Sequence, residues 1–257
     1  MGLALAWKVL AAAVLLAVAA TVGAIAYFNH THPASLGLAS FTPRPTASAS
    51  PDDPLSLVCR RPAVPGASTG GGVAGLWVIQ PGSVAGYRAR EQFAELTSPH
   101  EAVARTDSVR GWLLIGESGG SPRIETGCIA VDVRTLRSVD EIPGFNTSDR
   151  DSASRDFLGA GEHPYVVFQP YPIALQLNAA NTGVQHAKLA GDLEIRGTKK
   201  TEQFTLDILV SGAQVAAAGS TVVPVNEFGV EVPQEAGGFV RVDPRITLEV
   251  SLVLLKP

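Results

Sequence analysis

The chain has few of the residues on which catalytic, metal-binding and nucleic-acid-binding sites depend. Its 257 residues include two cysteines and five histidines, and 24 acidic against 20 basic residues give a net charge of −4. Without an excess of positive charge the chain has no electrostatic footprint for DNA or RNA, so we expect no nucleic-acid partner. HExxH, CxxC and P-loop motifs are absent, and the glycines of residues 68–75 follow no strand-like run. We therefore expect neither a metal site nor a cofactor.

One long apolar run lies near the N-terminus. Residues 9–28 carry no charge, and as a helix with a rise of about 1.5 Å per residue they would span roughly 30 Å, the thickness of a bilayer core. A cleavable signal peptide is the alternative, with small residues at 24–26, but no polar region separates these from the run, which favours an uncleaved anchor. Lys8 precedes the run and no Lys or Arg follows before Arg44, so we expect residues 1–8 in the cytoplasm and the remainder outside.

A linker and one folded domain follow the predicted anchor. Residues 29–73 are rich in Pro, Ser, Thr, Ala and Gly and lack apolar periodicity. They predict a disordered linker with a mean span of roughly 35 to 40 Å, enough to hold a domain clear of the membrane. Residues 74–257 form the predicted domain. Outside the cytoplasm Cys59 and Cys128 can form one disulfide bond or remain isolated thiols.

Short runs of alternating polarity, separated by glycine and proline, make up the predicted domain. Around Gly197 the apolar residues Leu193, Ile195, Phe204 and Leu206 share one face of a predicted hairpin. A sheet with one apolar face must close on itself or pack on a second sheet, so the runs predict an all-β antiparallel barrel or sandwich. The strand-like runs are residues 76–79, 84–93, 103–115, 122–133, 165–177, 188–196, 202–210, 214–225 and 239–255.

A single short helix is predicted among the strands, at residues 148–159. Ser148 and Asp151 have the spacing of a capping box, and Gly159 can end the helix. We expect this helix to cover one end of a barrel.

The most tempting catalytic motif is the GxSxG pattern of residues 116–120, centred on Ser118. A nucleophile elbow needs a strand, a sharp turn and a helix, whereas Pro122 and another strand-like run follow Ser118, which favours a hairpin loop. Asp192 and Glu194 share the face opposite the apolar one, so we expect solvated carboxylates and not catalytic acids. We therefore expect that the protein is not an enzyme.

Fragments in a fixed order along the domain carry a family resemblance. They are residues 77–79, 83–88, 110–113, 129–133, the Arg150-Asp151 pair, 163–168, 191–197, 228–229 and 242–254. On these fragments residues 76–255 resemble the YceI-like family, as a membrane-anchored member of the actinobacterial type. The resemblance implies an eight-stranded antiparallel lipocalin-like barrel that holds an isoprenoid chain outside the bacterial cytoplasmic membrane without catalysis. Ser154 departs from the family, which usually has a leucine after the Arg-Asp pair.

Strand alternation within the resembling segments assigns the inward-facing side chains, which we expect to line a ligand cavity. They are Tyr87, Leu113, Ile129, Val131, Val166, Phe168, Leu193, Ile195, Phe204, Leu206, Leu248 and Val250. Cys128 then lies on the outer face, where a bond to Cys59 would strap the linker onto the barrel wall.

Two functions remain open from the sequence. In the first, the barrel binds an isoprenoid or a similar long apolar lipid, and residues 9–28 tie it to the membrane. In the second, its own side chains fill the barrel, and the domain serves as a structural or protein-interaction module at the cell envelope. Trp112 and Leu114 alternate to the outer face, where exposed apolar residues can mark a partner surface.

Overall fold

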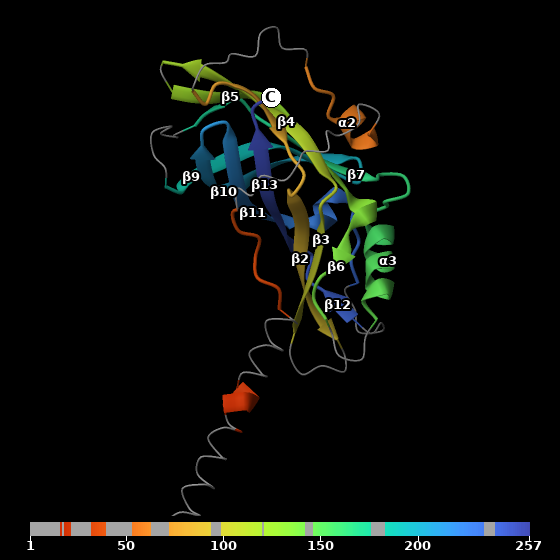
Figure 1. Cartoon of the computed structure of the whole chain (residues 1–257). Coiled ribbons are helices and arrows are strands. Elements are labelled where there is room, and N and C mark those ends of the chain that lie inside the picture. Colours follow the sequence, from red (N-terminus) through yellow and green to blue (C-terminus); the bar gives the residue numbers. More distant parts are fainter. Residues whose placement is uncertain are drawn as a thin grey trace, which may run out of the picture.

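The computed structural model describes residues 16, 18–21, 32–39, 53–62, 72–93, 99–119, 121–141, 146–175, 183–233 and 240–257. The alternating runs form one antiparallel sheet that curls into a barrel (Figure 1). Its strands are β1 Gly75–Ile79, β2 Val84–Phe93, β3 His100–Thr106, β4 Val109–Ser118, β5 Ser121–Asp132, β6 Arg137–Ser138, β7 Tyr165–Pro170, β8 Ile173–Ala174, β9 Gln185–Ile195, β10 Thr198–Ser211, β11 Gln214–Pro224, β12 Val240–Val242 and β13 Arg245–Leu255. The helices are α2 Pro54–Val58 and α3 Thr147–Phe157, with short 3-10 turns η1 Val133–Thr135 and η2 Val225–Phe228.

Eight strand positions close the barrel. β1 and β2 both pair with β13, at successive positions along it, and together act as one long bent strand. β4 pairs with β1 and β3 pairs with β2, so β3 and β4 together also act as one long bent strand. From β4 the sheet continues through β5, β7, β9, β10 and β11 back to β13, and every pairing is antiparallel. The predicted all-β, eight-stranded antiparallel barrel is confirmed.

The hairpin between β9 and β10 shows how the local sequence sets the register. Arg196 and Gly197 have φ angles of 51° and 74°, and Ile195 pairs directly with Thr198. Two central residues with positive φ form a type I′ turn, whose twist matches that of the flanking strands. Leu193 and Ile195 consequently lie buried on the inner face.

The predicted helix is present as α3, with a different N-terminal cap. Asn146, and not Ser148, caps the helix: its side chain accepts a hydrogen bond of 3.0 Å from the Ser148 N–H. The predicted end is correct, because Gly159 takes a φ of 62°, and the N–H groups of Gly159 and the next residue donate to carbonyl oxygens of the last turn. This pair of bonds is the Schellman motif, in which glycine avoids the strain of a left-handed conformation.

Part of the predicted linker packs on the outer wall of the barrel. Leu55 and Cys59 from α2 and the residue after it form a buried cluster with Trp112, whose Nε1–H donates to the Cys59 carbonyl oxygen over 3.1 Å. Trp112 is only 8 % exposed, and Leu114 packs partly buried against the same cluster. The expectations of a disordered linker at residues 53–62 and of an exposed apolar surface at Trp112 and Leu114 are therefore wrong.

A disulfide bond fixes α2 to this wall. Cys59 and Cys128, 69 positions apart in the sequence, are bonded, with their Cα atoms 5.4 Å apart. Beside the bond, Arg110 Nε lies 2.9 Å from Asp53 Oδ2. This is the strap that the outward position of Cys128 predicts.

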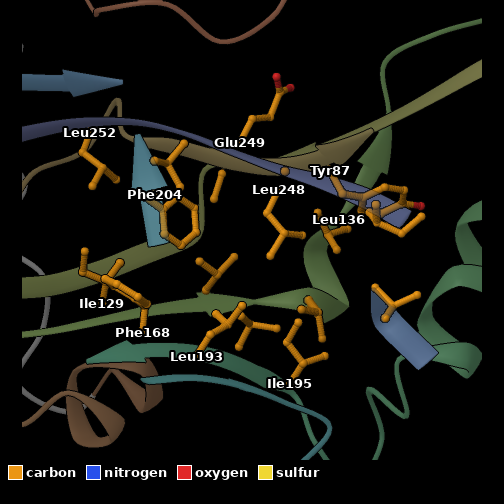
Figure 2. A pocket seen from close by; sticks show the side chains of 18 of the residues that line it. Tyr87, Ile129, Leu136, Phe168, Leu193, Ile195, Phe204, Leu248, Glu249 and Leu252 are labelled. Atoms are coloured by element: carbon orange, nitrogen blue, oxygen red, sulfur yellow. The ribbon is translucent and has the colours of Figure 1, made fainter. Parts of the chain in front are cut away.

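A second linker segment, residues 32–39, lies against β13 and β2, and we call it the clasp (orange-red in Figure 1). The Leu36 N–H donates to Glu249 Oε2 over 3.1 Å, and Arg88 Nη2 donates to the Pro33 carbonyl oxygen over 2.8 Å. The Arg88 and Glu249 side chains are both buried, and the Glu249 carboxylate points away from the barrel interior (Figure 2). The expectation of a disordered linker is wrong here as well.

Within the described residues, no helix is long and apolar enough to cross a membrane. Most of the predicted span, residues 9–28, lies outside the described residues, of which only 16 and 18–21 fall within it. The anchor therefore stays a prediction.

Candidate ligand-binding cavity

The barrel encloses a cavity of about 500 Å³. Alternate side chains of the strands point into it: on β13, Leu248 and Val250 line the cavity, while the carboxylate of Glu249 between them points away (Figure 2). An eight-stranded barrel can be filled by its own side chains or leave room for one small ligand. In this barrel room remains.

All twelve residues that strand alternation assigns to the interior line this cavity. Five of them are buried, namely Phe168, Leu193, Ile195, Phe204 and Leu206. The other seven, namely Tyr87, Leu113, Ile129, Val131, Val166, Leu248 and Val250, are partly buried. The part of all twelve residues in holding a ligand stays a prediction.

Apolar side chains from neighbouring and opposite strands surround most of the cavity. The rings of Phe168 on β7 and Phe204 on β10 meet edge to face, with centroids 5.1 Å apart and planes at 70°. Trp77 also lines the cavity, and its only polar atom, Nε1, donates to the Val73 carbonyl oxygen over 2.7 Å. A lining of this kind suits a hydrocarbon chain.

Glu91 makes the end of the cavity near α3 polar. It lies 6 % exposed within the inner row of β2, and Arg150 of α3 faces it, with Nη1 3.5 Å from Glu91 Oε2. Neither of these two buried atoms has a hydrogen-bond partner among the described residues. Burial raises the pKa of Glu91, and the positive charge of Arg150 only partly opposes this. The inner row of β2 comprises Ala85, Tyr87, Ala89, Glu91 and Phe93.

Asp140 holds Arg150 in place through an ion pair. Its Oδ1 accepts from Arg150 Nη2 over 2.5 Å and from the Val103 N–H over 2.8 Å, and its Oδ2 accepts from His100 Nε2 over 2.6 Å. Burial alone would raise the pKa of Asp140, but these hydrogen bonds outweigh it and lower the pKa to about 2. Asp140 therefore stays ionised at neutral pH and neutralises the charge of Arg150.

Two hydroxyl groups complete the polar end. Tyr87 Oη and Ser154 Oγ are hydrogen-bonded at 2.8 Å, so the residue that replaces the usual leucine joins α3 to the barrel through a polar contact. Burial raises the pKa of Tyr87, so its phenol remains protonated at neutral pH.

Sequence reasoning assigned no role to Glu91 or Asp140, and it used Arg150 only as part of a family motif. A signal for Glu91 was present, because counting in steps of two from the inward Tyr87 reaches position 91. Asp140 carried no such signal, since it follows the two-residue strand β6 and acquires its role only through His100 and Arg150.

The other candidate residues lie away from the cavity. Ser118 pairs with Ser121 in the hairpin of β4 and β5, so a strand and not a helix follows it, as the sequence predicts. Asp192 and Glu194 lie on the outer wall, where Asp192 accepts a hydrogen bond from the Tyr171 hydroxyl. Across the part of the chain that the structure describes, no group of three or more His, Cys, Asp or Glu residues could hold a metal ion.

Several solved structures are similar to this chain, and three of them illustrate the likeness. A polyisoprenoid-binding domain from Saccharophagus degradans, implicated in plant cell wall breakdown, is 11 % identical with a TM-score of 0.52, and the match covers 70 % of this chain and 98 % of that domain. BcnA of Burkholderia cenocepacia is 14 % identical, with a TM-score of 0.44 and coverage of 66 % and 95 %. The Campylobacter jejuni YceI protein is 13 % identical, with a TM-score of 0.35 and coverage of 63 % and 82 %. The first of these supports the barrel fold.

The sequence comparison assigns the family. No curated protein sequence matches the chain. The sequence pattern of the YceI-like domain, however, matches residues 92–254, which is more than half of the chain and runs from the polar end of β2 to the last strand. The chain belongs to the YceI-like family.

Proposed function

We propose that the protein is a non-catalytic binding protein that holds an isoprenoid or a similar long apolar lipid inside its barrel. The observation that carries this proposal is the closed barrel with an apolar cavity of about 500 Å³. This volume falls within the range of roughly 300 to 1,000 Å³ that is usual for ligand pockets. The polyisoprenoid-binding domain of Saccharophagus degradans, which shares the fold, supports the choice of an isoprenoid.

The volume sets the length of chain that the barrel can hold. A methylene group takes up about as much room as a water molecule, which occupies about 30 Å³, so the cavity accommodates roughly 17 carbon atoms. This corresponds to a chain of three to four isoprene units. Each buried methylene contributes about 0.8 kcal/mol, so ten carbons alone supply roughly 8 kcal/mol before the cost of ordering the ligand.

We further propose that residues 9–28 anchor the protein and that the barrel lies outside the bacterial cytoplasmic membrane. Residues 29–31 are all that separates the end of the predicted anchor from the clasp, and the four Cα-to-Cα steps from residue 28 to residue 32, at about 3.6 Å each, reach at most about 14 Å. The barrel would therefore sit close to the bilayer surface, and not 35 to 40 Å away as a wholly flexible linker would allow. A disulfide bond between Cys59 and Cys128 fits an oxidising compartment.

A pair of valine substitutions tests the binding function. Val250 lines the cavity, whereas Val222 on the neighbouring strand β11 is 47 % exposed on the outer wall. We expect V250W to fill the cavity and weaken binding of radiolabelled geranylgeraniol by about tenfold or more, and V222W to change it by less than about twofold. The tested chain should begin at residue 29 so that the clasp and α2 are retained. Equal binding by all three proteins, or no binding by the wild type, would contradict the proposal.

A further inference from the structure

We propose that the end of the cavity at Glu91 and Arg150 binds an uncharged hydroxyl head group, so that the ligand is a long-chain isoprenoid alcohol and not the corresponding diphosphate. The inference rests on the proposed lipid-binding function and specifies which class of lipid the barrel selects.

The position of the polar groups separates a head from a tail within one cavity. Tyr87 lies at the α3 end of the pocket, while Leu252 lies at the opposite end (Figure 2). Glu91 lies further along the same inner row of β2 as Tyr87, and Arg150 and Ser154 reach this end from α3. A ligand whose chain fills the apolar part therefore places its terminus beside these groups.

The hydrogen-bonding state of the pair indicates what the terminus must offer. Glu91 Oε2 and Arg150 Nη1 are buried without hydrogen-bond partners among the described residues, although they lie 3.5 Å apart. An unsatisfied buried donor or acceptor is destabilising, so such groups in native proteins usually await a water, an ion or a ligand. One hydroxyl can accept from the guanidinium of Arg150 and donate its proton to the ionised carboxylate of Glu91.

The charge at this end disfavours an anionic head group. Arg150 is the only basic side chain among the described residues that line the cavity, and its charge is already offset by Asp140. Glu91 and Asp149 also line this end. A diphosphate would bring several negative charges into a desolvated site with one neutralised cation, which is strongly unfavourable.

A competition experiment tests this selectivity. The full-length protein in a mild detergent is mixed with equal amounts of geranylgeraniol, its methyl ether and geranylgeranyl diphosphate, and native mass spectrometry counts the bound forms. We expect the alcohol-bound form to exceed each of the others by about tenfold or more, since hydrogen bonds to charged groups are strong and a diphosphate lacks compensating cations. The ether matters most, because it keeps the oxygen but has no proton to give to Glu91.

Three variants locate the selectivity. E91L should bind the alcohol and its methyl ether within about twofold of each other, while the diphosphate stays disfavoured because Asp140 still neutralises Arg150. E91Q, whose amide oxygen can still accept from the ligand hydroxyl, should retain most of the preference for the alcohol over the ether. E194L is the matched control. Glu194 is on the outer wall with its side chain 41 % exposed, so the preference of this variant among the three lipids should equal that of the wild type.

The outcomes separate the inference from the function beneath it. Equal binding of the three lipids by the wild type, preference for the diphosphate, or an undiminished preference of E91L for the alcohol over the ether would overturn the head-group assignment and leave lipid binding standing. Absence of any bound lipid on the wild type would overturn the proposed function as well. If E91L does not fold, loss of the preference in E91Q together with E194L-like stability would equally contradict the assignment.

Discussion

Two buried charge networks lie on opposite faces of β2, and they differ in how completely they are bonded. On the outer face, Glu249 Oε2 accepts from Arg88 Nε over 2.9 Å and from the clasp, and Oε1 accepts from Arg105 Nε over 3.0 Å. On the inner face, Glu91 Oε2 and Arg150 Nη1 have no hydrogen-bond partner among the described residues. One network is saturated by the protein itself, while the other leaves a donor and an acceptor facing a cavity.

The difference indicates different roles for two similar sets of residues. A buried carboxylate with both oxygens bonded holds separate segments together, because removing it leaves buried cations without a partner. A buried carboxylate with an oxygen that accepts no hydrogen bond adds little to the stability of the fold, and that oxygen remains available to a ligand. On this comparison the outer network is structural and the inner one is a recognition site.

Removal of the outer carboxylate should have the largest effect on stability. E249L leaves Arg88, 9 % exposed, and Arg105 without their shared partner and removes the bond to the Leu36 N–H of the clasp, so we expect a loss of about 3 to 5 kcal/mol in the free energy of unfolding by urea. E101L is the control, since Glu101 also bonds Arg88 but its side chain is 47 % exposed, and it should lose less than about 1 kcal/mol. Equal losses in the two variants would end the distinction between a saturated network and a surface ion pair.

The disulfide bond is the second contact that holds the linker on the outer wall. Its removal should cause the second largest loss of stability. C59S opens a loop that joins positions 69 residues apart, so we expect a loss of about 2 to 4 kcal/mol in unfolding free energy together with exposure of Trp112. Chemical denaturation followed by tryptophan fluorescence measures both effects. A loss below about 1 kcal/mol would show that α2 holds without the bond.

The inner carboxylate should have the smallest effect on stability, and one that depends on pH. Because burial raises the pKa of Glu91 above 4.5, the folded protein keeps this proton to a higher pH than the unfolded chain does, and wild-type stability falls as pH rises through that window. E91Q cannot titrate, so the difference in unfolding free energy between E91Q and the wild type should move in favour of E91Q as the pH rises from 4.5 to 8. If E91Q is instead the less stable protein at pH 8 by more than 1 kcal/mol, Glu91 and Arg150 form a structural pair like the outer one.

Alternation and turn chemistry made the barrel predictable from the sequence. Both signals are local: Arg196 and Gly197 fix one hairpin, and a period of two then decides which way Leu193 or Leu248 points. The same local reasoning missed Asn146 as the N-terminal cap of α3. The capping-box pattern at Ser148 can also occur within the first turn of a helix, so the pattern alone does not fix the residue at which the helix begins.

The docked linker segments could not be predicted in this way. Leu36 and Glu249 are 213 positions apart, and their bond exists only after the barrel has closed. Composition alone makes residues 32–39 and 53–62 look disordered, since proline, serine and alanine carry little burial energy. These segments are ordered by their contacts with the outer wall of the barrel: α2 packs on Trp112, and the clasp is hydrogen-bonded to the Glu249 network.

The most direct test of the account is the identity of what the barrel carries when it is isolated from its own cells. Lipid extracted from the purified wild-type protein and from V250W is compared by mass spectrometry. We predict a long-chain isoprenoid alcohol in near-stoichiometric amount on the wild type and its loss from V250W. A wild-type protein that carries no apolar chain, and that takes up none when geranylgeraniol is added, would contradict the account.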